Sequence, residues 1–184
     1  MLIECINKYR SLKHKKMNPR VSIIMGSTSD LTIMEKAAKV LDDMGIPFEM
    51  NALSAHRTPV EVEEFAKNAA KRGIEVIIAG AGMAAHLPGV IAAMTPVPVI
   101  GVPINASLNG MDALLAITQM PPGIPVATVA INGAMNAGIL AVQILAVGDK
   151  TLKVKMIDFK ESLKKKIVDA NKELAEVKYN CKTN

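Results

Sequence analysis

Side chains suited to proton transfer and anion binding stand together in the segment Ser-Ala-His-Arg-Thr-Pro at 54–59. His56 suits general acid–base chemistry because a histidine titrates near neutral pH, and Arg57 suits a phosphate or carboxylate through paired hydrogen bonds. The alternative interpretation is a loop histidine that only bonds to backbone. Because the segment follows an expected strand and precedes an expected helix, we favour a functional pair.

A second segment, Gly-Ser-Thr-Ser-Asp at 26–30, leads directly into an expected helix. Free backbone amides and the helix dipole at such a start suit a phosphate, and Asp30 suits ribose hydroxyls. Ser27 and Ser29 add hydroxyl groups beside it. The alternative, that Ser29 or Asp30 only caps the helix, stays equally open from these residues alone. The segment is neither a P-loop nor a dinucleotide-binding glycine motif.

A third segment, Ala-Gly-Ala-Gly-Met-Ala-Ala-His-Leu-Pro-Gly at 79–89, is rich in small residues. Gly80 and Gly82 allow backbone to approach a ligand closely, and the amides that follow suit a carboxylate. His86 is a candidate for chemistry and, equally, for a structural histidine. The polar segment 103–110 suits a lid. The sequence contains no metal-ligand spacing and no G-x-S-x-G nucleophile motif.

These segments are positioned by a regular alternation of apolar strands and amphipathic helices from residue 21 onward. Thr58 and Glu61 predict a capping box at the start of the second helix. The alternation predicts an α/β fold: a three-layer αβα sandwich around five parallel strands, flavodoxin-like or Rossmann-like. Ligands in such folds bind beyond the carboxyl ends of the strands. The predicted strands are 21–25, 47–53, 76–79, 97–102 and 126–131, and the predicted helices are 31–44, 59–72, 84–94, 110–119, 134–147 and 149–178.

Charge is unevenly distributed along the 184 residues. The net charge of +5 arises from +4 at 1–19, −3 at 20–148 and +4 at 149–184. These ranges predict a flexible N-terminal extension, one catalytic α/β domain, and a C-terminal helix with a tail. Because the folded centre is acidic, we expect no nucleic-acid partner. One hypothesis for the extension is that Met17 is the natural start, and its rival is a short helical arm.

The cysteines and the apolar runs of the sequence indicate in which cellular compartment we expect the protein. Cys5 and Cys181 give neither a disulfide framework nor a zinc spacing. The N-terminus lacks the pattern of a signal peptide, and no apolar run is long enough for a membrane span. We therefore expect a cytoplasmic protein with no membrane partner.

Four segments in register resemble the N5-carboxyaminoimidazole ribonucleotide mutases of purine biosynthesis. Three are described above, and the fourth is Gln-Met-Pro-Pro-Gly-Ile-Pro-Val at 119–126. The resemblance covers about residues 20–148. It implies an isomerase that converts N5-carboxyaminoimidazole ribonucleotide into 4-carboxy-5-aminoimidazole ribonucleotide without metal, ATP or organic cofactor. In that mechanism CO2 leaves the exocyclic nitrogen, stays in the pocket and is captured at ring carbon C4.

The resemblance also implies residue roles. His56 is the general acid/base that protonates the nitrogen and later removes the C4 proton, and His86 is a second catalytic candidate nearby. Of the substrate-binding residues that the resemblance implies, those before residue 60 bind the phosphate and ribose or line the pocket. Those in the 81–87 loop hold the migrating carboxylate through backbone amides. The expected substrate-binding set is Ser27, Ser29, Asp30, Ser54, Arg57, Ala81, Gly82 and Leu87.

Alternatives to the mutase stay open. A carboxylase branch of the family takes CO2 and aminoimidazole ribonucleotide directly. In that branch the segment that corresponds to 54–59 resembles Ser-Ala-His-Lys-Gly-Pro. This chain has Arg57 and Thr58 instead of the Lys-Gly pair, which favours the mutase branch. A non-enzymatic nucleotide sensor is the alternative of another class; His56 and Asp30 argue against lost chemistry. A receiver-like domain is disfavoured because 80–82 holds no phospho-accepting aspartate.

The resemblance implies partners as well. The family forms octamers of four-fold dihedral symmetry, so we expect a homo-octamer in which the helix 149–178 packs on a neighbouring subunit. The mutase reaction also requires a separate ATP-dependent synthetase that supplies the ribonucleotide substrate.

Three residues, at two places in the sequence, depart from the family pattern. Met83 stands where glycine is frequent, and Asn132 and Gly133 stand where Gly-Asn or Gly-Lys is usual. We expect these departures to change local loop shape and to leave the chemistry intact.

Overall fold

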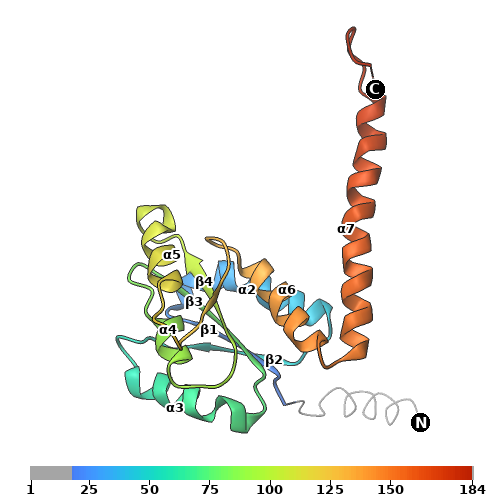
Figure 1. The fold of residues 1–184 in the computed structure, drawn as a ribbon. Coiled ribbons are helices and arrows are strands. Elements are labelled where there is room, and N and C mark those ends of the chain that lie inside the picture. Colours follow the sequence, from blue (N-terminus) through green and yellow to red (C-terminus); the bar gives the residue numbers. More distant parts are fainter. Residues whose placement is uncertain (1–17, 184) are drawn as a thin grey trace, which may run out of the picture. The chain divides into compact units, whose positions relative to one another are not determined.

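The computed structural model describes residues 18–183, in which the strands form one parallel sheet (Figure 1). The order across the sheet is β2-β1-β3-β4-β5, and every neighbouring pair is parallel. The predicted α/β fold around five parallel strands is therefore confirmed. The hypotheses about Met17 and the segment before it lie outside the described residues. The strands are β1 (Val21–Met25), β2 (Phe48–Ala52), β3 (Val76–Gly82), β4 (Val99–Ile104) and β5 (Ala127–Thr128).

Helices cover both faces of the sheet (Figure 1). One face packs against α3 (Pro59–Ala69), α4 (Leu87–Ala92) and α5 (Met111–Thr118), which share a buried apolar cluster with Ala79 of β3. The next residue of that strand, Gly80, points to the opposite face because successive positions of a strand alternate.

That opposite face packs against α2 (Leu31–Asp43). A Cβ on Gly80 would lie only 2.4 Å from Met34 Sδ of this helix. α6 (Ala134–Ala146) begins beside α2, since a Cβ on Gly138 would lie 3.0 Å from the carbonyl oxygen of Ala37. The glycines therefore set how closely these layers approach.

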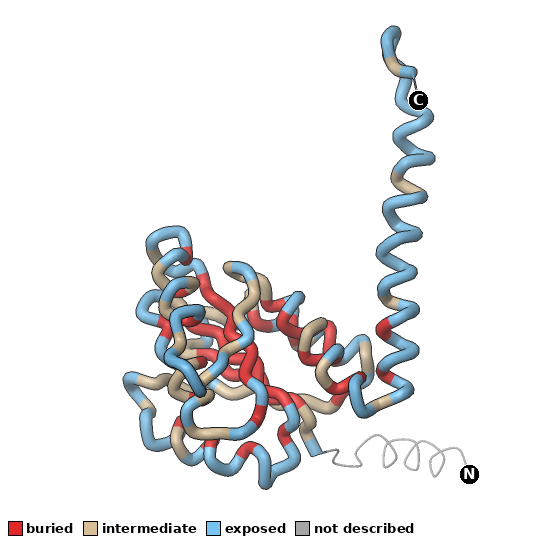
Figure 2. Tube along the Cα trace, in the orientation of Figure 1, coloured by how far each residue is buried: buried red, intermediate tan, exposed pale blue. Residues whose placement is uncertain are grey.

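The core follows the three central strands (Figure 2). All residues of β1 and β4 are buried, as are those of β3 before Gly82. Such continuous burial is typical of parallel strands covered on both faces. Ser22 is fully buried within β1, and its hydroxyl donates to Glu49 Oε1 of the edge strand β2 over 3.0 Å.

The boundary after β3 differs from the prediction. The strand runs to Gly82, which is paired with Ile104, so the small residues 80–82 end a strand and do not begin a loop. The helix predicted at 84–94 is reduced to α4, because Met83 and Ala85 have φ values of 56° and 44°. Right-handed helix cannot begin through such residues.

The predicted capping box at α3 is wrong. Thr58 occupies the N-cap position without a side-chain cap. Its Oγ1 instead accepts from the Ser54 amide at 2.9 Å and donates to the Ser54 carbonyl at 3.1 Å. The hydroxyl thus closes the turn that carries the 54–58 loop. Other element boundaries lie close to those predicted, except that β5 has only two residues.

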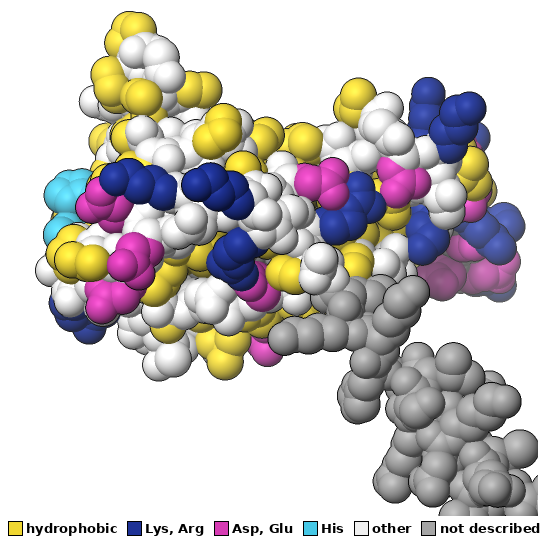
Figure 3. Space-filling view, turned by 90° about the horizontal axis from the view of Figure 1, so that it is seen from below, with side chains coloured by type: hydrophobic (Ala, Val, Ile, Leu, Met, Phe, Trp, Pro, Cys, Tyr) yellow, Lys and Arg dark blue, Asp and Glu magenta, His cyan; other side chains and the backbone are white. Residues whose placement is uncertain are grey.

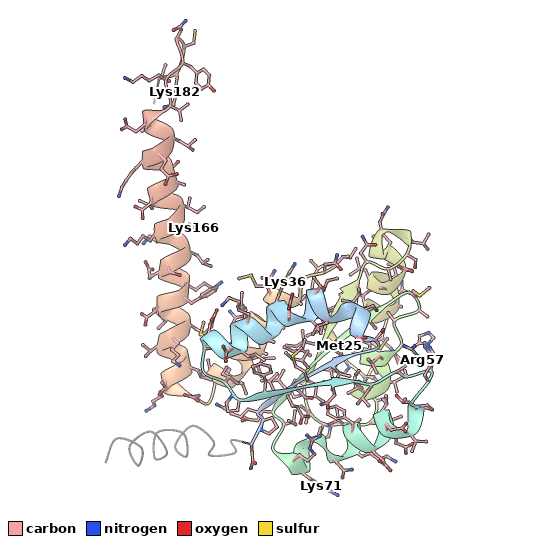
Figure 4. All side chains as sticks on the ribbon, turned by 180° about the vertical axis from the view of Figure 1, so that it is seen from behind. Met25, Lys36, Arg57, Lys71, Lys166 and Lys182 are labelled. Atoms are coloured by element: carbon pink, nitrogen blue, oxygen red, sulfur yellow. The ribbon has the colours of Figure 1, made fainter. Side chains whose placement is uncertain are left out.

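The chain forms two compact units, with the division between Ala141 and Val142 inside α6. In the second unit, α7 (Lys150–Glu176) is capped by the Asp149 carboxylate, which accepts from the amides of Thr151 and Leu152 at 3.0 and 3.1 Å. Lys166 projects from the middle of α7, and Lys182 lies beyond its end (Figure 4). Across the described part of the chain, no helix is long and apolar enough to cross a membrane.

Candidate functional site

A cavity of about 590 Å³ lies where β1, β2, β3 and β4 end. It gathers residues from segments that are far apart in the sequence, as the carboxyl edge of a parallel sheet does. Nine of the ten predicted site residues line it, and the tenth, His86, contacts a lining residue. The lining comprises Gly26, Ser27, Ser29, Asp30, Ser54, Ala55, His56, Arg57, Ala81, Gly82, Met83, Ala84, Ala85, Leu87 and Ala106.

Arg57 ties two of these loops together. Its Nη2 donates to the Gly26 carbonyl at 2.8 Å, and its Nε donates to the Ser54 hydroxyl at 3.4 Å. Both acceptors are uncharged, so neither hydrogen bond pairs the guanidinium with a negative charge. In Figure 4, Arg57 lies at one end of α3 and Lys71 at the other. An exposed guanidinium held in this way suits a phosphate group.

The two described histidines form a pair. His56 Nε2 lies 2.8 Å from His86 Nδ1, and the rings meet edge to face with centroids 4.9 Å apart. One of these two nitrogens must donate the hydrogen and the other accept it, so the tautomers of the two rings are linked. Both rings are exposed, and Figure 3 shows histidine at the surface at one edge of the molecule. His56 therefore lines the cavity with the ring of His86 in hydrogen-bond contact.

Asp30 is the acidic group of the cavity. Burial raises the pKa of its carboxyl above the ordinary value, although hydrogen bonds with the Ser29 hydroxyl and the Ser27 backbone act in the opposite direction. Ser27, and neither Ser29 nor Asp30, provides the side-chain cap here: its Oγ accepts from the Ser29 amide at 3.3 Å. The interpretation of Ser29 or Asp30 as simple helix caps is therefore wrong, and both residues line the cavity.

The rest of the cavity lining, called the apolar wall below, consists mainly of small apolar residues. Ala81 and Gly82 end β3, and Ala106 follows β4. The two segments are in close contact, because a Cβ on Gly82 would lie 2.8 Å from Ala106 Cβ. Such a wall leaves room for a flat ligand or a small neutral molecule.

Six lining residues were absent from the sequence-based set, and all but one are glycine or alanine. Small side chains give no chemical signal, so only their position beside predicted residues could have indicated them. Ala106 is detectable in principle, because β4 is the neighbour of β3 and the sequence suits a lid in the loop after β4. The sixth, Met83, was noted only as a departure from a family pattern.

Metal binding finds no support in these side chains. In residues 18–183, no group of three or more His, Cys, Asp or Glu side chains is arranged to hold a metal ion. The chemistry that this arrangement offers is proton transfer by a histidine pair beside a cationic and hydroxyl-rich binding surface.

Comparisons with known proteins agree with this description. Residues 20–166 match the family model described as AIR carboxylase. A Pyrococcus abyssi protein named N5-carboxyaminoimidazole ribonucleotide mutase is 59% identical over 148 residues, which cover 80% of this chain and 85% of the relative. The crystal structure of Treponema denticola PurE has a TM-score of 0.75 and 30% identity, covering 85% of this chain and 98% of that one.

A longer relative is also similar. The Schizosaccharomyces pombe phosphoribosylaminoimidazole carboxylase is 51% identical over 178 residues. These cover 95% of this chain and 32% of the relative. The chain is therefore similar to relatives named as mutase and to relatives named as carboxylase. It covers most of the mutase relative but only about a third of the carboxylase relative.

Proposed function

The chain belongs to the AIR carboxylase family, and we propose that its pocket converts N5-carboxyaminoimidazole ribonucleotide into 4-carboxy-5-aminoimidazole ribonucleotide in de novo purine biosynthesis. The enzyme is thus an isomerase that moves a carboxylate within one molecule. The observation that carries the proposal is a cavity lined both by His56, Arg57 and Asp30 and by small apolar residues.

Substrate binding uses the polar side of the cavity. Arg57, already anchored to the Gly26 carbonyl, binds the phosphate with help from the hydroxyls of Ser27 and Ser54. Asp30, hydrogen-bonded to Ser29, accepts hydrogen bonds from the ribose. These contacts hold the base between His56 and the small-residue wall, so the reacting atoms meet without a bimolecular encounter.

Proton transfer belongs to His56. As the carbamate N–C bond breaks, the imidazolium donates a proton to the exocyclic nitrogen and CO2 forms. When the new C4–C bond has formed, the neutral imidazole removes the C4 proton, which restores the starting state. His86, whose Nδ1 lies 2.8 Å from His56 Nε2, fixes the ring and shares the proton between these steps.

Between the two steps, the released CO2 stays beside the apolar wall of the cavity. Ala81, Gly82 and Leu87 border this space and hold the migrating group close to C4. The amide of Ala85 donates to the Gly82 carbonyl at 3.1 Å, so this loop amide serves the turn and not the ligand. Confinement, more than backbone donors, then makes recapture efficient.

Direct carboxylation of aminoimidazole ribonucleotide with CO2 is the second candidate, favoured by the identity with the carboxylase relative. That relative is three times longer than the matched segment, whereas this chain covers most of its mutase relative. Coverage therefore favours the mutase.

A substrate-choice assay on the wild type and His56→Asn tests the proposal. One reaction receives the carbamate substrate, and another receives aminoimidazole ribonucleotide with low bicarbonate. We expect C4-carboxylated product from the carbamate alone, and a loss of at least about a hundredfold in kcat in the variant. Turnover only with CO2 indicates the carboxylase, and binding without turnover of either substrate indicates the sensor.

Further aspects of the proposal concern partners. We propose a homo-octamer with the α7 helix against a neighbouring subunit, and a cytoplasmic setting with an ATP-dependent synthetase that supplies the substrate. The catalytic domain is assigned to 20–148, and 149–184 to the helix and tail. The exposed apolar side chains of α7, including Leu163 and Ile167, support the assembly.

A further inference from the structure

We propose that Met83 retains the released CO2 in the pocket between the two half-reactions, an inference that rests on the proposed function. The apolar wall consists of glycine and alanine apart from two larger side chains, Met83 and Leu87. Leu87 is 2% exposed and belongs to the core, whereas Met83 is 62% exposed. Met83 is therefore the large apolar side chain of this lining that remains free to move over the cavity.

The backbone places this side chain at the tip of a tight turn. The Ala85 amide donates to the Gly82 carbonyl at 3.1 Å, so Met83 is the first central residue of a four-residue turn. Its φ of 56° is one that such turns usually reserve for glycine. A residue other than glycine in this conformation costs conformational energy, and such strain concentrates at functional sites.

The turn is anchored on both sides. Gly82 ends β3 and is paired with Ile104 of β4, and Ala85 is 4% exposed. Because the turn is held while its tip is exposed, the side chain of Met83 can move without displacing the backbone. An unbranched thioether with three rotatable bonds adapts to irregular apolar surfaces.

The chemistry of the intermediate requires such a cover. CO2 is small, carries no charge and has no net dipole, so the cationic and hydroxyl groups of the cavity cannot hold it as they hold phosphate. After the N–C bond breaks, CO2 either reaches C4 or diffuses into solvent and joins the bicarbonate pool. An apolar side chain that folds over the bound base excludes water and favours recapture.

Carboxyl-labelled substrate provides the test. The carbamate carrying a ¹³C carboxylate is mixed with excess enzyme in unlabelled bicarbonate and carbonic anhydrase, and the label retained in the C4-carboxylated product is measured by mass spectrometry. Reactions without enzyme correct for spontaneous loss. We compare the wild type with Met83→Ala and Met83→Gly, which remove the cover, and with Met83→Leu, which keeps an apolar side chain.

We expect high retention in the wild type and Met83→Leu, and a ratio of lost to retained label raised about tenfold in both truncations, the factor expected for partial burial of one apolar side chain. Free aminoimidazole ribonucleotide accumulates in parallel. If both truncations retain as much label as the wild type, the proposal is overturned. If only Met83→Gly loses label, the effect belongs to the backbone and the proposal is also overturned. A wild type that forms no product contradicts the proposed function instead. Thermal melting of each variant verifies folding.

Discussion

The carboxyl of Asp30 combines an energetic cost to folding with the binding role that we propose for it. Burial raises its pKa, so the folded protein holds this proton more tightly than the unfolded chain does. Stability from this group is therefore present at low pH and is lost as pH rises from the ordinary aspartate value of 3.8 through the raised pKa. We propose that the ionised carboxylate binds ribose, and burial makes this ionised form unfavourable in the fold.

Asp30→Asn separates these two effects. We expect the variant to exceed the wild type in free energy of unfolding by about 0.5 kcal/mol near pH 7, a small value because the group is partly exposed. Urea denaturation at several pH values measures the difference, which grows as pH rises above 3.8. Substrate affinity falls in the same variant. A stability difference that grows toward low pH contradicts this account.

The contact between His56 and His86 marks the limit of sequence reasoning at this scale. Each histidine was identifiable from its place after a strand, because parallel strands bring their carboxyl ends to one edge. Their separation of 2.8 Å is not predictable from the sequence, since it depends on the turn through Met83 and Ala85. Positive φ at methionine and alanine has no local sequence signal.

Strand β4 depends on Gly101 for its contact with α5. A Cβ at this position would lie 2.4 Å from Cγ2 of the fully buried Ile117 and 2.9 Å from Cγ1 of Val126. We expect Gly101→Ala to lower the free energy of unfolding by about 1–3 kcal/mol, because a packed core resists an added methyl group. Gly148→Ala is the control, since open space surrounds that position. Equal melting temperatures for the two variants refute this packing.

Among the elements, apolar runs predicted strands more reliably than they predicted where loops begin. β1 was predicted to the residue, as its five buried side chains give a clear signal. β3 was predicted to stop before Gly80, because glycine and alanine resemble loop residues in sequence. In the fold those small residues are needed where Met34 and Ala106 approach the strand. Tertiary packing, which a local pattern does not contain, decided the boundary.

The assembly of the whole molecule is expected to depend on one face of α7. Its apolar residues recur at intervals of three and four, and the later ones, Leu163, Ile167 and Leu174, are 44%, 65% and 57% exposed. A long helix with this face in water gains stability when a neighbouring subunit covers it.

Light scattering tests the role of this face. We expect the double variant Ile167→Lys and Leu174→Lys to lower the particle mass severalfold, because charges on a buried apolar face oppose association. Lys165→Ala, about 200° around the helix from Ile167, serves as the control and keeps the wild-type mass. Equal masses for the double variant and the wild type contradict an assembly through this face.

The arrangement of α3 has a practical consequence for handling the enzyme. Arg57 precedes this helix at the cavity, and Lys71 is exposed beyond its other end (Figure 4). Thirteen residues, mostly helical, lie between them, which places them roughly 20 Å apart along the axis. A fluorophore or a solid support coupled through a cysteine introduced at Lys71 would leave the substrate entrance unobstructed, so immobilised enzyme would keep its turnover.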